Sequence, residues 1–104
     1  ITKTINESLN NSTEVLIVEM GANHIGEINK MKKLIDPDIS IISDIGKQHM
    51  STFKTISNVL KAKLEIINFN KESSITIINN DNIYLKHLIV NLCYYLLLKT
   101  INHF

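Results

Sequence analysis

Blocks of apolar and polar residues alternate along the chain and predict strands separated by turns and helices. Residues 14–18 have the sequence Glu-Val-Leu-Ile-Val, the composition of a short strand that is buried on both faces. After a polar turn at residues 21–24, the apolar residues between Ile25 and Ile35 fall on one helical stripe. The Asp-Pro-Asp sequence at 36–38 is expected to end this helix, because proline disfavours helical geometry in the residue before it.

Two more strands are predicted further along the chain. Residues 39–45 form the second, which opens into the polar turn 46–49, and a helix is expected over residues 57–68. Residues 74–78 form the third strand, and an Asn-rich turn follows at 79–82. Strands that alternate with helices in this way indicate βαβ units with parallel strands and right-handed crossovers. The expected fold class is therefore α/β with a mainly parallel sheet.

The two ends of the chain carry weaker patterns. Residues 1–13 are expected to form a short helix or coil and then a turn, and the lack of a starting Met suggests that the chain begins inside a domain. The tail, residues 83–104, is predicted to form a third, buried helix rather than a membrane anchor. Its apolar run is interrupted by Asn91 and is shorter than the roughly 20 residues that span a bilayer.

Composition narrows the classes of protein that fit. A length of 104 residues allows one small domain or part of one. A net charge of +1 does not indicate a protein that binds DNA or RNA. All 11 basic residues are Lys, so no guanidinium group can clamp a phosphate or carboxylate. Cys93 is the single cysteine and no signal pattern precedes Ile1, so a reducing, cytoplasmic setting is expected.

Polar side chains are concentrated where the first predicted strand gives way to a helix. Glu19, Asn23, His24 and Glu27 fall within nine residues at this point. In open α/β sheets, ligands bind at the carboxyl ends of the strands. The same edge is expected to carry His49, which follows the second strand. The sequence therefore places its candidate chemistry at this edge.

Several sequence blocks resemble the central ATPase domain of the Mur ligases, in the family's order and at about its spacing. The blocks are Val18 to Ile28, residues 36–38, Ile45 to His49, Ala62 to Ile66, and Ile78 to Asn82. The resemblance implies that residues 1–104 are part of such a domain, with the best match at 14–82 and a divergent tail at 83–104. The implied fold is a three-layer sandwich of the P-loop NTPase type, incomplete in this chain.

The resemblance also implies an activity. Mur ligases phosphorylate a substrate carboxylate with ATP and let an amine attack the acyl phosphate. The branch that this chain resembles adds D-alanyl-D-alanine to a UDP-N-acetylmuramoyl-tripeptide during peptidoglycan precursor synthesis. ATP and Mg²⁺ are the implied cofactors. We expect a monomer that has neither a nucleic acid nor a membrane as partner.

The family's functional residues can be carried over to five positions. The resemblance implies that Glu19 and His49 are ligands of a magnesium ion, and that Lys63 matches the lysine that is carbamylated in related ligases. Asn23 and His24 would face the nucleotide-sugar peptide or a second metal ion. Structural roles are the alternative: Glu19 could cap the next helix, His49 could be hydrogen-bonded, Lys63 could be solvated, and Asn23 and His24 could stabilise their loop.

The chain also departs from the family. It contains no Gly-x-x-Gly-Lys-Thr/Ser loop to hold the ATP phosphates, and residues 50–54 lack the Gly-rich, acidic composition expected after His49. Neither the Asn and Arg expected beyond the third strand nor the C-terminal domain has a counterpart. This chain alone is therefore not expected to catalyse a reaction. A non-catalytic remnant is one alternative. Another is a different member of the superfamily, such as a folylpolyglutamate synthetase or another Mur ligase, which the sequence of residues 23–27 argues against.

Overall fold

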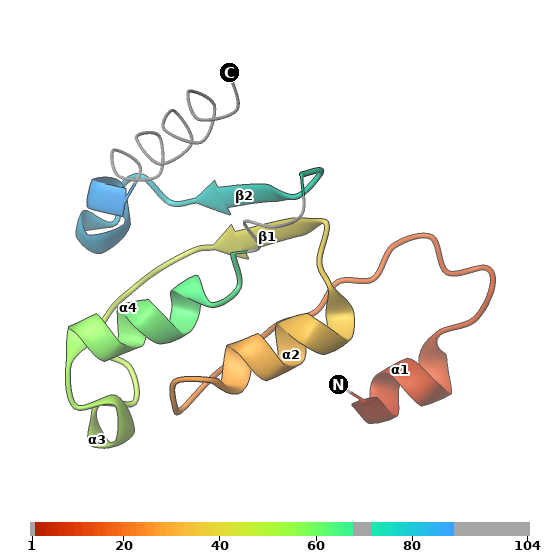
Figure 1. Cartoon of the computed structure of the whole chain (residues 1–104), viewed down its shortest axis with the longest axis horizontal. Helices are drawn as coiled ribbons and strands as arrows, with labels where there is room; N and C mark the ends of the chain where they lie inside the picture. Colours follow the sequence, from red (N-terminus) through yellow and green to blue (C-terminus); the bar gives the residue numbers. More distant parts are fainter. Residues whose placement is uncertain (1, 68–71, 89–104) are drawn as a thin grey trace.

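The computed structural model describes residues 2–67 and 72–88, which form a small α/β arrangement (Figure 1). Its elements, in chain order, are α1 (Thr2–Ser8), α2 (Glu27–Ile35), β1 (Ile39–Ile42), α3 (Met50–Phe53), α4 (Ile56–Leu64) and β2 (Ile75–Ile78). Residues 83–88 are also helical. This succession confirms the predicted α/β class and the predicted short helix near the amino end.

The two strands pair in parallel, as the sequence pattern predicts. Ile39 lies opposite Ile75 and Ile42 lies opposite Ile78. Backbone hydrogen bonds continue the ladder at both ends, from the Ile75 N–H to the Asp38 carbonyl at 2.9 Å and from the Asn79 N–H to the Ile42 carbonyl at 3.2 Å. The carboxyl ends of β1 and β2 therefore lie at one edge of the sheet.

The strand predicted at residues 14–18 does not form, and this prediction was wrong. The segment has no regular secondary structure, and Val15 and Ile17 are 74% and 91% exposed. Figure 1 shows it within the long connection between α1 and α2. A strand needs a hydrogen-bonding partner as well as a suitable composition, and no described residue pairs with this segment. The described sheet therefore has two strands rather than three.

The other predicted elements are present with shifted ends. Strand β1 ends at Ile42 rather than at residue 45, and α2 begins at Glu27 rather than at Ile25. Helix α4 begins one residue earlier than predicted, after Thr55, whose side chain accepts a hydrogen bond from the Asn58 N–H. It ends at Leu64 rather than at residue 68. The short helix α3 was not predicted, because four residues are too few to show a helical period.

The core lies against one face of the sheet. Its buried members are Ile42, Ile45, Phe53, Val59, Ala62, Ile67 and Leu85. Helices α2, α3 and α4 all lie on one side of the two strands (Figure 1). The opposite face of the sheet carries four isoleucines that are each at least half exposed: Ile39, Ile41, Ile75 and Ile77. Only one face of this sheet is covered within the described part of the chain.

Part of the predicted tail helix is present. Residues 83–88 are helical, and Leu85 is fully buried in the core. The remainder of the predicted helix, which includes Cys93, lies outside the described residues. Within residues 2–67 and 72–88, no helix has both the length and the apolar content that crossing a bilayer requires.

Candidate functional site

A small hollow lies beside the carboxyl end of β1, between the loop that precedes α2 and the loop that precedes α3. It is lined by Met20, Gly21, Ala22, Ile28, Gln48, His49, Phe53, Val59 and Lys63. Its volume is about 60 Å³, which is room for a few water molecules but not for a nucleotide. The hollow brings together two predicted site residues, His49 and Lys63, with Met20, the residue directly after Glu19.

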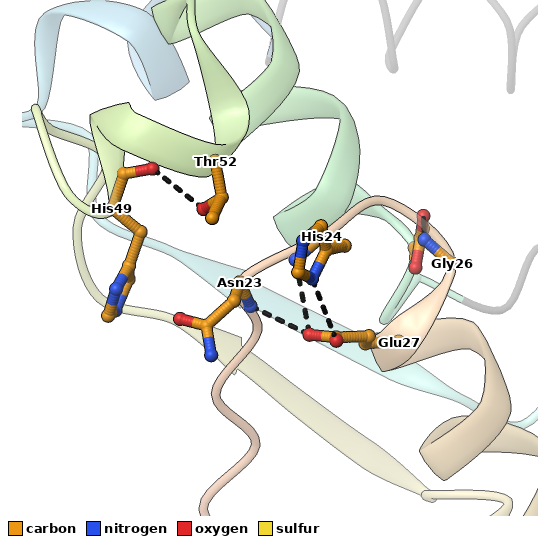
Figure 2. A network of polar contacts seen from close by, with 7 residues as sticks. Asn23, His24, Gly26, Glu27, His49 and Thr52 are labelled. Carbon is orange, nitrogen blue, oxygen red and sulfur yellow. Dashed lines mark hydrogen bonds and ion pairs between the residues drawn. The ribbon is translucent and has the colours of Figure 1, made fainter.

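The backbone around His49 is fixed by the turn that starts α3. His49 has a left-handed conformation, with φ 50° and ψ 40°. Its carbonyl accepts hydrogen bonds at 3.0 Å from the N–H groups of Thr52 and Phe53. It also accepts one at 3.0 Å from the Thr52 hydroxyl (Figure 2). The imidazole itself is exposed. The turn thus uses the backbone of His49 and leaves its side chain available at the hollow.

Lys63 reaches from α4 to the loop that follows β1. Its Nζ donates to the Gln48 side-chain oxygen at 2.9 Å and to the Asp44 carbonyl at 3.3 Å. The Lys63 side chain is half-buried. Lys63 therefore holds α4 to the loop that carries Gln48 and His49.

The loop that carries Asn23 and His24 is organised by Glu27. The Glu27 carboxylate accepts the N–H of Asn23 at 2.7 Å and the N–H of His24 at 3.1 Å, and it lies 3.2 Å from the His24 Nδ1. In Figure 2 the His24 ring is directed toward Glu27, whereas the Asn23 side chain extends away from it. The hydrogen bonds from the Asn23 and His24 backbones hold the pKa of Glu27 below its ordinary value of 4.5.

Glu65, which the sequence pattern did not single out, links the end of α4 to the start of α2. Its carboxylate accepts the N–H of Gly26 at 2.6 Å and the N–H of Asn29 at 2.9 Å, both at the start of α2. These partners lie far from Glu65 in the sequence, and no local spacing could have indicated the contact.

Asn82 was likewise missed, although it lies in the Asn-rich turn that the sequence marked. Its Nδ2 donates to the Asp44 carboxylate at 2.5 Å and to the Ile45 carbonyl at 2.8 Å. Its Oδ1 accepts the N–H groups of Tyr84 and Leu85, which begin the helix at residues 83–88. Asn82 therefore joins the loops after both strands at the edge of the sheet.

Comparison with known proteins decides the family. The Mur ligase middle domain family matches residues 1–93 of the chain. The chain belongs to the Mur ligases. No solved structure matches it.

Three curated relatives of this Mur ligase chain have the name UDP-N-acetylmuramoyl-tripeptide--D-alanyl-D-alanine ligase. The protein from Bacillus subtilis is 39% identical over 70 residues, which are 67% of this chain and 15% of that enzyme. The Rickettsia prowazekii protein is 35% identical over 75 residues, 72% of this chain and 17% of that enzyme. The Escherichia coli protein is 36% identical over 66 residues, which are 64% of this chain and 15% of that enzyme. The chain thus spans between 15% and 17% of the length of these relatives.

The two predicted metal ligands, Glu19 and His49, are both exposed. Within the described residues there is no group of three or more His, Cys, Asp or Glu side chains placed to hold a metal ion. Magnesium is commonly bound by one or two protein side chains, with water and substrate phosphates completing the coordination. The exposed His49 side chain and the exposed Glu19 carboxylate, which lies next to Met20 at the hollow, are compatible with such a partial ligand set in a Mur ligase.

Proposed function

We propose that this chain is part of an ATP-dependent amide ligase that adds D-alanyl-D-alanine to a UDP-N-acetylmuramoyl-tripeptide in peptidoglycan precursor synthesis. The observation that carries the proposal is the identity of 35% to 39% with relatives of that name, together with the family match over residues 1–93. We expect the protein to act in the cytoplasm as a monomer.

The proposed reaction assigns a role to each predicted site residue. ATP would transfer its γ-phosphoryl group to the carboxylate of the tripeptide, and the amine of D-alanyl-D-alanine would displace phosphate and form the amide bond. Magnesium, when bound, offsets the charge of the phosphate oxygens. Glu19 and His49 would hold this ion, and Asn23 and His24 would contact the nucleotide-sugar peptide.

Lys63 has two possible states in this proposal. Carbamylation would convert its ammonium group into a carboxylate-like ligand, and it requires a neutral amine. In the structure, Nζ donates to Gln48 and to the Asp44 carbonyl. Carbamylation would therefore replace these two contacts. A Lys63→Ala enzyme that is rescued by a short-chain carboxylate would favour the carbamate.

The exposed face of the sheet supports a three-layer arrangement in the complete domain. Parallel sheets are covered by helices on both faces, and here only one face is covered. The other face carries Ile39 and Ile41 beside Ile75 and Ile77, a contiguous apolar surface. We propose that a further helical layer of the full ligase covers these four side chains.

A ligase assay on the full-length protein that carries this chain tests the proposal. Phosphate release from ATP should require both the UDP-linked tripeptide and D-alanyl-D-alanine, and single amino acids should not replace the dipeptide. This chain alone, which lacks the Gly-x-x-Gly-Lys-Thr/Ser loop, should release no phosphate. If the full-length protein does not use D-alanyl-D-alanine, the alternatives are favoured: a non-catalytic remnant of a ligase, or a member of another branch of the superfamily.

Substitution of the proposed metal ligands tests their roles in the same assay. Glu19→Ala and His49→Ala should each lower turnover by orders of magnitude at limiting magnesium, because charge on the phosphate oxygens would be less well offset. Glu14→Ala and His87→Ala are matched controls, since both residues are exposed and have no assigned role. Turnover near the wild-type value in the Glu19 or His49 variant would remove that residue from the site.

A further inference from the structure

Glu65 connects two parts of the site that are far apart in the sequence. It directly follows α4, it is half-buried, and its carboxylate accepts the N–H groups of Gly26 and Asn29 at 2.6 and 2.9 Å. A carboxylate that accepts hydrogen bonds at the first turn of a helix also interacts favourably with the helix dipole. The proposed chemistry makes no use of this residue.

The start of α2 depends on this contact because it has no cap of its own. Gly26 is the N-cap residue, and glycine has no side chain to accept an N–H from the first turn. Its φ of 98° is a left-handed conformation that glycine adopts without strain. Glu65 therefore supplies from another helix the acceptor that α2 lacks locally.

The end of α4 consequently holds both loops that border the hollow. On one side, Lys63 donates to Gln48 and to the Asp44 carbonyl, in the loop that carries His49. On the other side, Glu65 holds the start of α2, directly after the loop that carries Asn23 and His24. These two residues, two positions apart, set the separation of the loops.

We propose that Glu65 is a positioning residue of the ligase site. This proposal rests on the proposed function in one respect, namely that the site belongs to a ligase. By holding the first turn of α2 against α4, Glu65 fixes Asn23 and His24 relative to Lys63. Because Glu65 and Glu27 occupy the N–H groups of Gly26, Asn29, Asn23 and His24, this helix terminus binds carboxylates of the chain rather than a phosphate. Asn23 and His24 then meet substrate through their side chains.

Nuclear magnetic resonance of the full chain tests the contact without an activity assay. In Glu65→Gln at neutral pH, the amide proton resonances of Gly26 and Asn29 should both move away from their wild-type positions, because an uncharged amide is a weaker acceptor than a carboxylate. Glu7→Gln, the same change at an exposed residue of α1, should leave both resonances in place.

The positioning role has its own readout. In Glu65→Gln, the backbone amides of Asn23 and His24 should shift and become more mobile, while the resonances of buried Val59 and Leu85 stay unchanged. In the full-length ligase, the same variant should raise the KM for the UDP-linked substrate about tenfold or more, with a smaller change in kcat, because misplaced contact residues weaken binding.

The outcomes separate the two proposals. If the Gly26 and Asn29 amide resonances have the same positions in Glu65→Gln and wild type, or if Asn23 and His24 are unaffected, the positioning role is wrong whatever the activity. If the amides behave as expected but the full-length protein does not use D-alanyl-D-alanine, the coupling of α4 to α2 stands and the proposed substrate fails.

Discussion

Glu27 shows how one ionised side chain can organise a loop. Its pKa lies below 4.5 because the Asn23 and His24 backbones donate to the charged form. A carboxylate whose pKa is lowered by folding stabilises the fold at pH values above its ordinary pKa. That contribution is lost as the pH falls through the lowered pKa. The loop with Asn23 and His24 should therefore loosen in acid.

Glu27→Gln should reproduce this loosening at neutral pH, because an uncharged amide is the weaker acceptor. Hydrogen exchange of the Asn23 and His24 amides should be several-fold faster than in wild type at pH 7. The ratio of the two rates should approach one below the pKa of Glu27. A ratio that does not change with pH would contradict the assignment of these hydrogen bonds to the carboxylate.

Comparison of Gly26 with Gly21 measures how much a left-handed backbone conformation costs a residue that has a side chain. A Cβ at either position would meet no atom within 4 Å, but only Gly26 has a positive φ. Gly26→Ala should therefore lower the free energy of unfolding by about 1 kcal/mol. Gly21→Ala should change it by less than about 0.5 kcal/mol. Urea unfolding would measure both, and equal losses would mean that φ at residue 26 is not the cause.

Short-range spacing accounts for the part of the site that the sequence predicted. Asn23, His24 and Glu27 lie within five residues of the sequence. The family resemblance assigns site roles to Asn23 and His24, and also to Glu19, His49 and Lys63. Their predicted catalytic roles stay predictions. Glu65 was missed because its partners are brought to it by the packing of α2 on α4. A local pattern contains no information about such a contact.

At the scale of elements, composition predicted the paired strands but could not tell them from the segment at residues 14–18. All three are short and rich in Ile or Val. Strands β1 and β2 pair with each other and present Ile42 and Ile78 to the core side. Residues 14–18 have the same β propensity and no partner among the described residues, so propensity alone gives no strand.

Asn82 is expected to contribute more than an ordinary helix cap. Asn82→Ala would remove two acceptor bonds to the helix at residues 83–88 and two donor bonds to Asp44 and Ile45. The loss in free energy of unfolding should be about 2 to 3 kcal/mol. Thr55→Ala removes a single cap bond to Asn58 and should cost about 1 kcal/mol. Equal losses would mean that the bonds to Asp44 and Ile45 contribute nothing.

At the scale of the whole molecule, the exposed isoleucine face predicts self-association of the isolated chain. Exposed apolar surface on an open sheet is prone to aggregate. The double variant with Ile41→Thr and Ile77→Thr should stay monomeric up to a higher concentration than the wild type, as measured by light scattering. Its free energy of unfolding should change by less than about 1 kcal/mol.

Ile42→Ala is the contrasting change, because Ile42 is a buried member of the core on the opposite face. It should lower the free energy of unfolding by about 2 to 5 kcal/mol. It should not reduce self-association. If the double Thr variant aggregates as readily as the wild type, the isoleucine face is not the surface that associates.

The parallel pairing of β1 with β2 also determines the order in which the chain can fold during synthesis. Helices α3 and α4 lie between the two strands in the sequence, and their contacts are local, so they can form early. Closing the loop between the strands costs entropy that only the completed ladder offsets. On the ribosome, β1 therefore emerges well before its partner exists. Its isoleucines must remain unpaired until residues 75–78 have been translated.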